Sequence, residues 1–77
     1  MICILTTKQK TNQYNNLRSV VLPAVKGEME ILAGHSETFA LLRPGKVILK
    51  KITNGQIEIK INKGLACVFR DKIVIIL

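Results

Sequence analysis

One stretch of the chain, KVILKKITNGQIEIKIN at residues 46–62, constrains the fold more than any other. It places Asn54-Gly55 between two β-patterned runs. Asn-Gly is the strongest short signal for a β-hairpin, because both central residues of a two-residue hairpin turn need a positive φ. The stretch therefore predicts an antiparallel hairpin. With a two-residue turn, the expected register pairs Ile52 with Ile57, Lys51 with Glu58, and Ile48 with Ile61.

The second arm of this hairpin predicts a strand with one dry face and one wet face. Ile57, Ile59 and Ile61 alternate with Glu58 and Lys60, and successive side chains of a strand point to opposite faces. Such alternation is typical of an antiparallel sheet that has one face on the core and the other in solvent. The hairpin is therefore expected in a layered β structure.

Strand-like runs recur at short intervals along the rest of the chain, and no window shows the period of a helix. Turn formers separate them: Gly27 is expected at a positive φ, Gly34 stops one run, and Pro44-Gly45 lies in a turn. These features predict a single all-β domain over residues 1–77, a small sandwich or flattened barrel. Besides the hairpin, strands are expected at 2–5, in an edge segment ending near Tyr14, and at 17–23, 29–32, 37–42, 65–69 and 73–77.

The residues that could carry chemistry are few and scattered. The chain of 77 residues has one histidine and five acidic residues against twelve basic ones, for a formal net charge of +7. His35 has no nucleophile beside it, because Ser36 is its sequence neighbour and points to the opposite face of an extended strand. No set of ligands has the spacing of a metal site, and no glycine-rich loop can cradle a phosphate. We expect a non-enzyme without a cofactor, in which His35 is either a turn residue with a local hydrogen bond or a contact residue.

Neither export nor membrane insertion is indicated. The opening MICIL has no basic segment ahead of it, and the longest apolar run, IVIIL, is far shorter than the roughly 20 residues that span a bilayer. Cys3 and Cys67 have neither metal-ligand spacing nor a Cys-x-x-Cys arrangement. We expect both to be reduced core residues, with a disulfide between them as the alternative.

The basic charge leaves two classes of partner open. A small basic β-barrel that binds single-stranded nucleic acid is one hypothesis, because lysines neutralise phosphates. Such barrels stack bases on aromatic side chains, whereas Tyr14, Phe39 and Phe69 do not alternate with basic residues. A protein-interaction module is the other hypothesis, and the pattern favours it. The lysines about the hairpin are also typical of a solvated face or a guarded edge: Lys46, Lys50, Lys51, Lys60 and Lys63.

GEMEILAGH at residues 27–35, followed by SETFALLRPG at 36–45, resembles the epsilon subunit of bacterial and chloroplast rotary ATP synthases, in its N-terminal β-sandwich. The family pattern is Gly-Glu-x-Gly-Ile-x-Pro-Gly-His, then Leu-x-Pro-Gly. Glu30 and Ala33 stand where the family usually has Gly and Pro, and Asn62-Lys63-Gly64 replaces Ser-Gly-Gly. The matching positions are Gly27, Glu28, Ile31, Gly34, His35, Leu42, Pro44 and Gly45.

The resemblance implies a ten-stranded sandwich of two sheets that belongs to the central rotor. It implies binding to the gamma subunit and to the ring of proteolipid subunits, and a non-catalytic part in coupling proton flow to ATP synthesis. The expected place is the cytoplasmic face of the inner membrane, or the stromal face of a thylakoid, as a peripheral subunit. The family usually continues into an α-helical hairpin that inhibits ATP hydrolysis, and we expect the sandwich alone in residues 1–77.

The resemblance also gives the acidic stretch a role. We interpret GEMEILAGH as a loop at the bottom of the sandwich, which other rotor subunits contact through Glu28, Met29, Glu30 and His35. Glu28 matches the family's acidic position at the ring contact, and Glu30 points the same way on an extended strand. The two carboxylates are therefore expected to form one acidic patch that faces a basic residue on each ring subunit. The alternative is that both merely keep a turn soluble.

Overall fold

The computed structural model describes all of residues 1–77 and contains nine β-strands. The all-β prediction is confirmed, with nine strands where the resemblance implied ten. The structure has no helix that is long and apolar enough to cross a membrane. In chain order the strands are β1 (Ile2–Thr6), β2 (Thr11–Tyr14), β3 (Leu17–Ala24), β4 (Gly27–Leu32), β5 (Thr38–Leu42), β6 (Gly45–Lys51), β7 (Gly55–Ile61), β8 (Gly64–Val68) and β9 (Lys72–Ile76).

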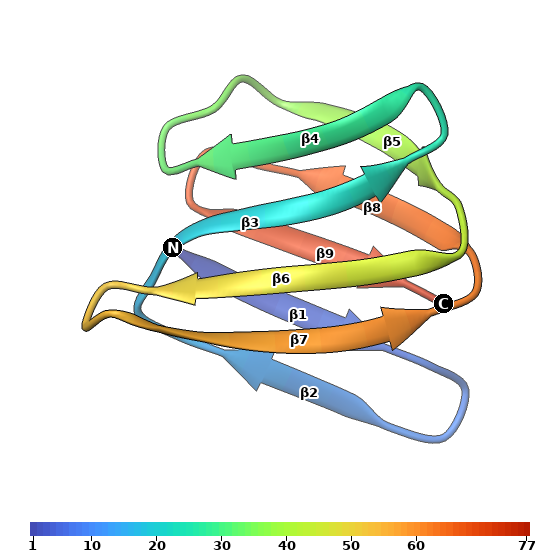
Figure 1. Ribbon diagram of the computed structural model, residues 1–77, viewed down its shortest axis with the longest axis horizontal. Coiled ribbons are helices and arrows are strands. Elements are labelled where there is room, and N and C mark those ends of the chain that lie inside the picture. The colour runs from blue at the N-terminus through green and yellow to red at the C-terminus, as the bar shows by residue number, and fades with distance from the viewer.

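The strands form one curled sheet that folds into two layers (Figure 1). The front layer has the order β4-β3-β6-β7 and the rear layer the order β5-β8-β9-β1-β2. The layers join at one corner, where Ala24 of β3 pairs with Leu42 of β5. Away from that corner, Met1 and Leu17 exchange two backbone hydrogen bonds. Most ladders are antiparallel, but β1 and β9 pair in parallel. The result is a flattened sandwich in which β4 and β5 are adjacent edges.

One apolar core fills the space between the layers. Every strand except β2 supplies residues to it, mostly at alternate positions, as the two-residue period of a strand requires. Leu49 of β6 and Ile73 of β9 are fully buried examples from the two layers. The cluster has 14 members: Cys3, Leu5, Leu17, Val20, Leu22, Ile31, Leu42, Val47, Leu49, Ile61, Ala66, Val68, Ile73 and Ile75.

The central hairpin forms as β6 and β7, but its predicted register is wrong. Three residues, 52–54, link the strands, and among them Asn54 alone has a positive φ, of 65°. Gly55 is the first residue of β7 and pairs with Lys51. The predicted register would turn Lys50 toward the core in place of Leu49, because a shift by an odd number of residues exchanges the two faces of a strand. The observed pairs are Leu49 with Ile57, Ile48 with Glu58, Val47 with Ile59, and Gly45 with Ile61.

The remaining predicted turn residues behave as follows. Gly27 has φ +134°, as expected, and it follows the two-residue connection between β3 and β4. Gly34 also has a positive φ, of 84°, in the connection after β4. Pro44 lies between β5 and β6, whereas Gly45 begins β6 and is not part of the turn. Gly64 has a different reason to be glycine, because a Cβ there would lie 2.6 Å from the carbonyl oxygen of Ile76.

Candidate partner-binding surface

The acidic stretch at residues 27–35 is a strand followed by a turn, and not a single loop. Gly27–Leu32 form β4, which pairs with β3 along the front layer (Figure 1). Only residues 33–37 connect β4 to β5. The interpretation of the whole stretch as a bottom loop is therefore wrong, because residues 27–32 pair with β3 as a strand of the sheet. Glu28 and His35 consequently lie at opposite ends of the sandwich.

Glu28 and Glu30 share the outer face of the front layer, and Glu30 is held there by two donors. The hydroxyl of Ser19, which is only 1% exposed, donates to Glu30 Oε2 at 2.8 Å. Lys50 Nζ donates to the same oxygen at 3.2 Å. The hydrogen bond from Ser19, followed by the hydrogen bond and charge of Lys50, lowers the pKa of Glu30. The predicted acidic patch is therefore weaker than expected, because Lys50 neutralises one of its two carboxylates.

His35 makes only local contacts. Its Nδ1 donates to the carbonyl oxygen of Ser36 at 2.8 Å, and its backbone N–H donates to the carbonyl oxygen of Leu32 at 3.2 Å. The neighbouring Gly34 N–H donates to the carbonyl oxygen of Arg70 at 2.7 Å, which ties this turn to the one between β8 and β9. These bonds agree with a structural role for His35 in the turn. No three His, Cys, Asp or Glu side chains come together as a potential metal site.

The outer face of the rear layer is apolar across four adjacent strands, β5, β8, β9 and β1. The registers place outward side chains next to one another, for example Phe39 opposite Cys67 and Cys67 opposite Val74. Lys72, which pairs with Ile2 at one margin, is the one charged residue at the outward positions of these four strands, and Thr6, which pairs with Ile76 at the other margin, is the one polar uncharged residue. We call this surface the rear face; it consists of Ile2, Ile4, Phe39, Leu41, Leu65, Cys67, Val74 and Ile76.

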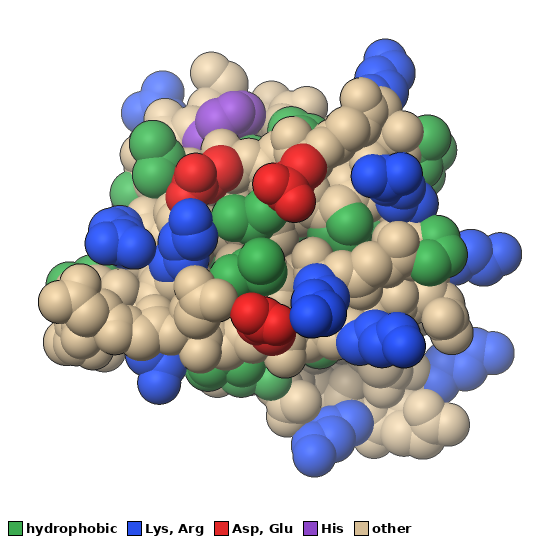
Figure 2. All heavy atoms as spheres, viewed as in Figure 1, with side chains coloured by type: hydrophobic (Ala, Val, Ile, Leu, Met, Phe, Trp, Pro, Cys, Tyr) green, Lys and Arg blue, Asp and Glu red, His purple; other side chains and the backbone are tan.

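Three side chains of the rear face are exposed to solvent. Phe39 is 74% exposed, Leu41 is 64% exposed and Ile76 is 45% exposed. The other members are half-buried. Contiguous exposed apolar side chains, unlike single ones, mark interaction sites on soluble proteins. The front layer is different, because red and blue charged side chains lie among the green apolar ones on its outer face in Figure 2. The ion pair between Lys46 of β6 and Glu58 of β7, at 3.2 Å, belongs to this layer.

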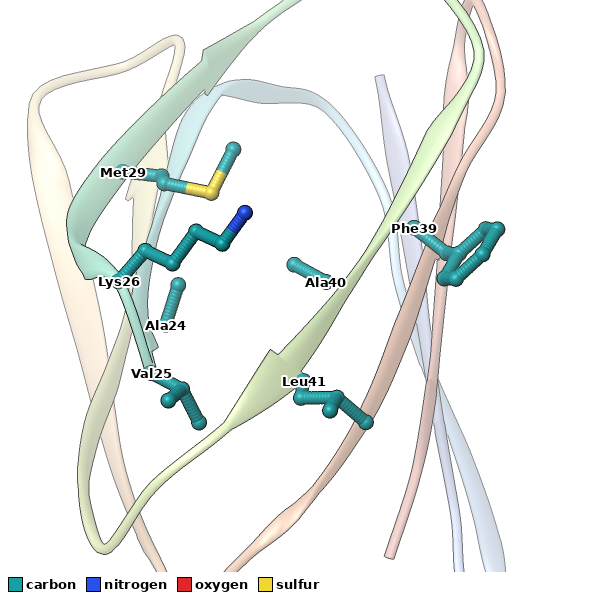
Figure 3. A pocket seen from close by; sticks show the side chains of 7 residues that line it. All are labelled: Ala24, Val25, Lys26, Met29, Phe39, Ala40 and Leu41. Atoms are coloured by element: carbon teal, nitrogen blue, oxygen red, sulfur yellow. The ribbon is translucent and has the colours of Figure 1, made fainter.

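A hollow of about 400 Å³ extends this apolar surface around the edge of the sandwich. It lies between the two edge strands β4 and β5 (Figure 3). Met29 and Ala40 point toward the space between the strands, whereas Phe39 and Leu41 point away from it onto the rear face. Met29, one of the predicted contact residues, thus belongs to the apolar hollow and not to an acidic loop. The full lining is Ala24, Val25, Lys26, Met29, Phe39, Ala40 and Leu41.

The two cysteines are free and differ in their surroundings. Cys3 is buried in the core, and burial raises the pKa of its thiol to about 11. Cys67 is only half-buried, because its side chain stands on the rear face. The prediction of a reduced core residue is therefore confirmed for Cys3, and it is wrong in its placement of Cys67. The disulfide alternative does not hold, since the two side chains lie on opposite sides of the rear sheet.

The comparison with known families identifies the sandwich. The family model described as ATP synthase, Delta/Epsilon chain, beta-sandwich domain matches residues 1–77. The chain belongs to this family. The ATP synthase epsilon chains of Helicobacter pylori strains Shi470 and G27 are each 42% identical to it over 60 residues, which are 78% of this chain and 48% of each relative. The chain thus spans about half the length of the curated relatives it matches.

Solved structures show the same fold. A chain in the cryo-EM structure of the Euglena gracilis mitochondrial ATP synthase, OSCP/F1/c-ring in rotational state 1, is similar with a TM-score of 0.88 and 24% identity, over 96% of this chain and 48% of that one. A chain in the Tetrahymena thermophila mitochondrial ATP synthase central stalk and c-ring is similar with a TM-score of 0.75 and 14% identity, over 99% of this chain and 63% of that one. The resemblance seen in the sequence is confirmed by these matches and by the family model.

Within this epsilon-type sandwich, the rear face is the feature that the sequence interpretation missed. Its signal was present in the runs ICIL, LACV and IVII, which are apolar at every position. A strand with one wet face alternates, as β7 does, whereas a continuous apolar run is typical of a strand covered on both faces. These runs therefore indicated strands that a second layer of protein covers from outside.

Proposed function

We propose that the chain is a non-catalytic subunit of the central stalk of an ATP synthase, which binds the gamma subunit through the rear face. It takes part in coupling proton flow to ATP synthesis by turning with gamma and the proteolipid ring. As a peripheral subunit it lies on the cytoplasmic side of the inner membrane, or on the stromal side of a thylakoid. The single observation that supports this proposal most is the apolar rear face on a chain of the epsilon family.

The rear face is suited to a permanent partner more than to a transient one. Its side chains come from four paired strands, so they form a rigid platform, and none of them is charged. Obligate interfaces are apolar and resemble a domain core cut in half. Rigid association is also what a rotor requires, because torque is lost if its subunits slip. The hollow between β4 and β5 adds a recess at the side of this platform.

The ring contact is proposed for the end of the sandwich at which β4 begins. Glu28 lies there, exposed and without an ion-pair partner, and it is the residue that matches the family's acidic position. His35 and Glu37 lie at the opposite end. Glu28 and His35 therefore face different partners in this proposal, and the ring contact includes Glu28 but not His35.

The gamma contact is tested with paired variants of exposed apolar residues. The double substitution Phe39→Ser with Leu41→Ser removes the two most exposed members of the rear face. We expect it to weaken binding to purified gamma subunit at least about tenfold, because exposed aromatic and aliphatic anchors dominate such interfaces. The matched control is Leu32→Ser with Ile52→Ser, which are also exposed apolar residues but lie off the rear face. The control is expected to bind like the unchanged chain.

Two results would contradict the gamma contact. One is equal binding by both double variants. The other is a stable dimer of the unchanged chain that dissociates only when the rear face is substituted, since a second copy would then be the partner.

The ring contact has its own test: Glu28→Lys is expected to lower proton pumping per ATP hydrolysed in reconstituted membranes, and Glu37→Lys at the opposite end is expected to leave it unchanged. The reverse pattern would move the ring contact to the other end.

A further inference from the structure

Basic side chains gather at one end of the sandwich. Four turns meet at this end, those between β1 and β2, β3 and β4, β5 and β6, and β7 and β8 (Figure 1). Backbone hydrogen bonds connect chain segments at this end: Val25 N–H donates to the carbonyl oxygen of Leu41 in β5 at 2.8 Å, and Leu77 N–H donates to the carbonyl oxygen of Thr6 in β1 at 3.0 Å. Figure 2 shows blue side chains along the same edge of the molecule. We call this surface the basic end; its charges are Lys8, Lys10, Lys26, Arg43 and Lys63.

These five cations have no partner within the chain. The two ion pairs of the structure are Lys46 with Glu58 and Lys50 with Glu30, and neither includes a member of the basic end. All five side chains are exposed. None of the four turns contains an acidic residue; Glu28, on β4, is the nearest in sequence. Unpaired like charges held side by side repel one another, so an external anion would stabilise this arrangement.

Exposed aliphatic side chains lie among the cations. Val25, Leu41 and Leu77 line a shallow depression together with Lys63, and Lys26 follows Val25 directly in the same turn. Val25 is 59% exposed although it is large and apolar. Lysines with long flexible stems beside short aliphatic groups are typical of surfaces that rest on the boundary between lipid headgroups and acyl chains.

Nucleic acid fits this end less well than lipid does. Single-stranded nucleic acid is bound by stacking bases on aromatic side chains, and none of the three aromatic residues lies in these four turns. Tyr14 is half-buried at the far end of β2, Phe39 belongs to the rear face, and Phe69 lies in the turn at the opposite end beneath Lys72. Four of the five cations are lysines, which act as point charges without the fixed geometry that arginine brings to a specific phosphate.

We propose that the basic end binds the anionic headgroup surface of a phospholipid bilayer. The five cations lie against lipid phosphates, and the aliphatic side chains of Val25, Leu41 and Leu77 reach the headgroup boundary. The proposal goes beyond the rotor role, and it agrees with it in orientation, since Glu28, the proposed ring contact, is near the same end. Of the residues named for the two contacts, only Leu41 belongs to both, and the lipid test substitutes lysines that lie off the rear face, so each proposal can fail without the other.

The test is sedimentation of the 77-residue chain with phospholipid vesicles. Vesicles of phosphatidylcholine mixed with phosphatidylglycerol are expected to bind the chain, and vesicles of phosphatidylcholine alone are not. Raising the salt from about 0.1 M to about 1 M shortens the screening length and should release the chain. The double substitution Lys26→Glu with Lys63→Glu is expected to lower the partition coefficient at least about tenfold.

The matched control reverses two charges at the opposite end, Lys51→Glu with Arg70→Glu, and reaches the same net charge. It is expected to lower the partition coefficient by less than about threefold, because charges more than a screening length from the membrane contribute little. A thermal melt of each variant verifies that it is folded. Failure to bind anionic vesicles overturns the proposal, and so does an equal loss in the two double variants. Displacement from the vesicles by a single-stranded oligonucleotide or by polyglutamate, at matched charge concentration, also overturns it, because the surface would then not be selective for a bilayer.

Discussion

The two outer faces of this sandwich are built on the same scaffold and yet have opposite chemistry. The front layer carries charged side chains outward, and two ion pairs link its strands: Glu30 of β4 with Lys50 of β6, across β3, and Glu58 of β7 with Lys46 of the adjacent β6. The rear layer carries eight apolar side chains outward, and Lys72, at the margin beside Ile2, is the one charged residue at the outward positions of β5, β8, β9 and β1. The inner sides of both layers are equally apolar. The contrast agrees with the proposal that the outer face of the front layer lies in solvent, whereas a partner covers the outer face of the rear layer.

The contrast predicts that alanine substitutions at two neighbouring residues of one strand lower the free energy of unfolding by different amounts. Ile73 and Val74 are consecutive on β9, but Ile73 is fully buried in the core and Val74 stands on the rear face. Ile73→Ala is expected to lower the free energy of unfolding by about 2–5 kcal/mol, because it leaves a cavity. Val74→Ala is expected to cost about 1 kcal/mol or less in the isolated chain. Urea denaturation measures both values, and similar losses would mean that the rear face is already part of the core of the isolated chain.

The stability of the folded chain is expected to depend on pH through Glu30, on the outer face of the front layer. Its pKa is lowered in the folded chain by Ser19 and Lys50, so its contribution to stability is present above the ordinary carboxyl pKa. That contribution is lost as the pH falls through the lowered pKa, because protonation then removes the charge that both donors contact. The melting temperature of Glu30→Gln should therefore lie below that of the unchanged chain near pH 7 and approach it as the pH falls through the lowered pKa of Glu30.

Glu37→Gln is the matched control for this measurement, because Glu37 is exposed and forms no ion pair. It is expected to melt like the unchanged chain at neutral pH. If Glu30→Gln and Glu37→Gln cannot be told apart near pH 7, the network of Ser19, Glu30 and Lys50 does not stabilise the front layer.

The smallest effect on stability is expected at the exposed ion pair on the outer face of the front layer. Lys46 and Glu58 lie on β6 and β7, and both side chains are largely open to solvent. Exposed pairs of this kind are usually worth up to about 0.5 kcal/mol, since water screens them. A double-mutant cycle with Lys46→Ala and Glu58→Ala measures the coupling. A value well above 1 kcal/mol would show that the front face holds the sheet together and is not merely a solvated surface.

The sequence predicted the strands themselves better than the register in which they pair. The alternation of Ile57, Ile59 and Ile61 correctly gave the inward side of β7, because that pattern is local. The hairpin register was missed because Asn-Gly supports both a two-residue turn and a three-residue link with asparagine in the left-handed conformation. The choice depends on the burial of Leu49 against the other layer, which the hairpin sequence does not contain.

The site was predicted less well than the fold. Glu28 and His35 are seven positions apart in a motif, but the strand β4 carries them to opposite ends of the sandwich. The rear face joins β1 to strands near the C-terminus, so no local window contains it. Its apolar runs could be recognised from the sequence as strands covered on both faces. Which molecule covers the outer face cannot be read from this chain, because it depends on the partner.

Cys67 offers the most direct test of the claim that a partner covers the rear face. Its thiol stands on that face between Phe39 and Val74, whereas Cys3 is hidden in the core as an internal control. The measurement is the rate of modification by a small maleimide, residue by residue, for the chain alone and for its complex with gamma. We predict that gamma slows the modification of Cys67 at least about tenfold and that Cys3 stays unmodified in both samples. Equal rates at Cys67 with and without bound gamma would contradict the account.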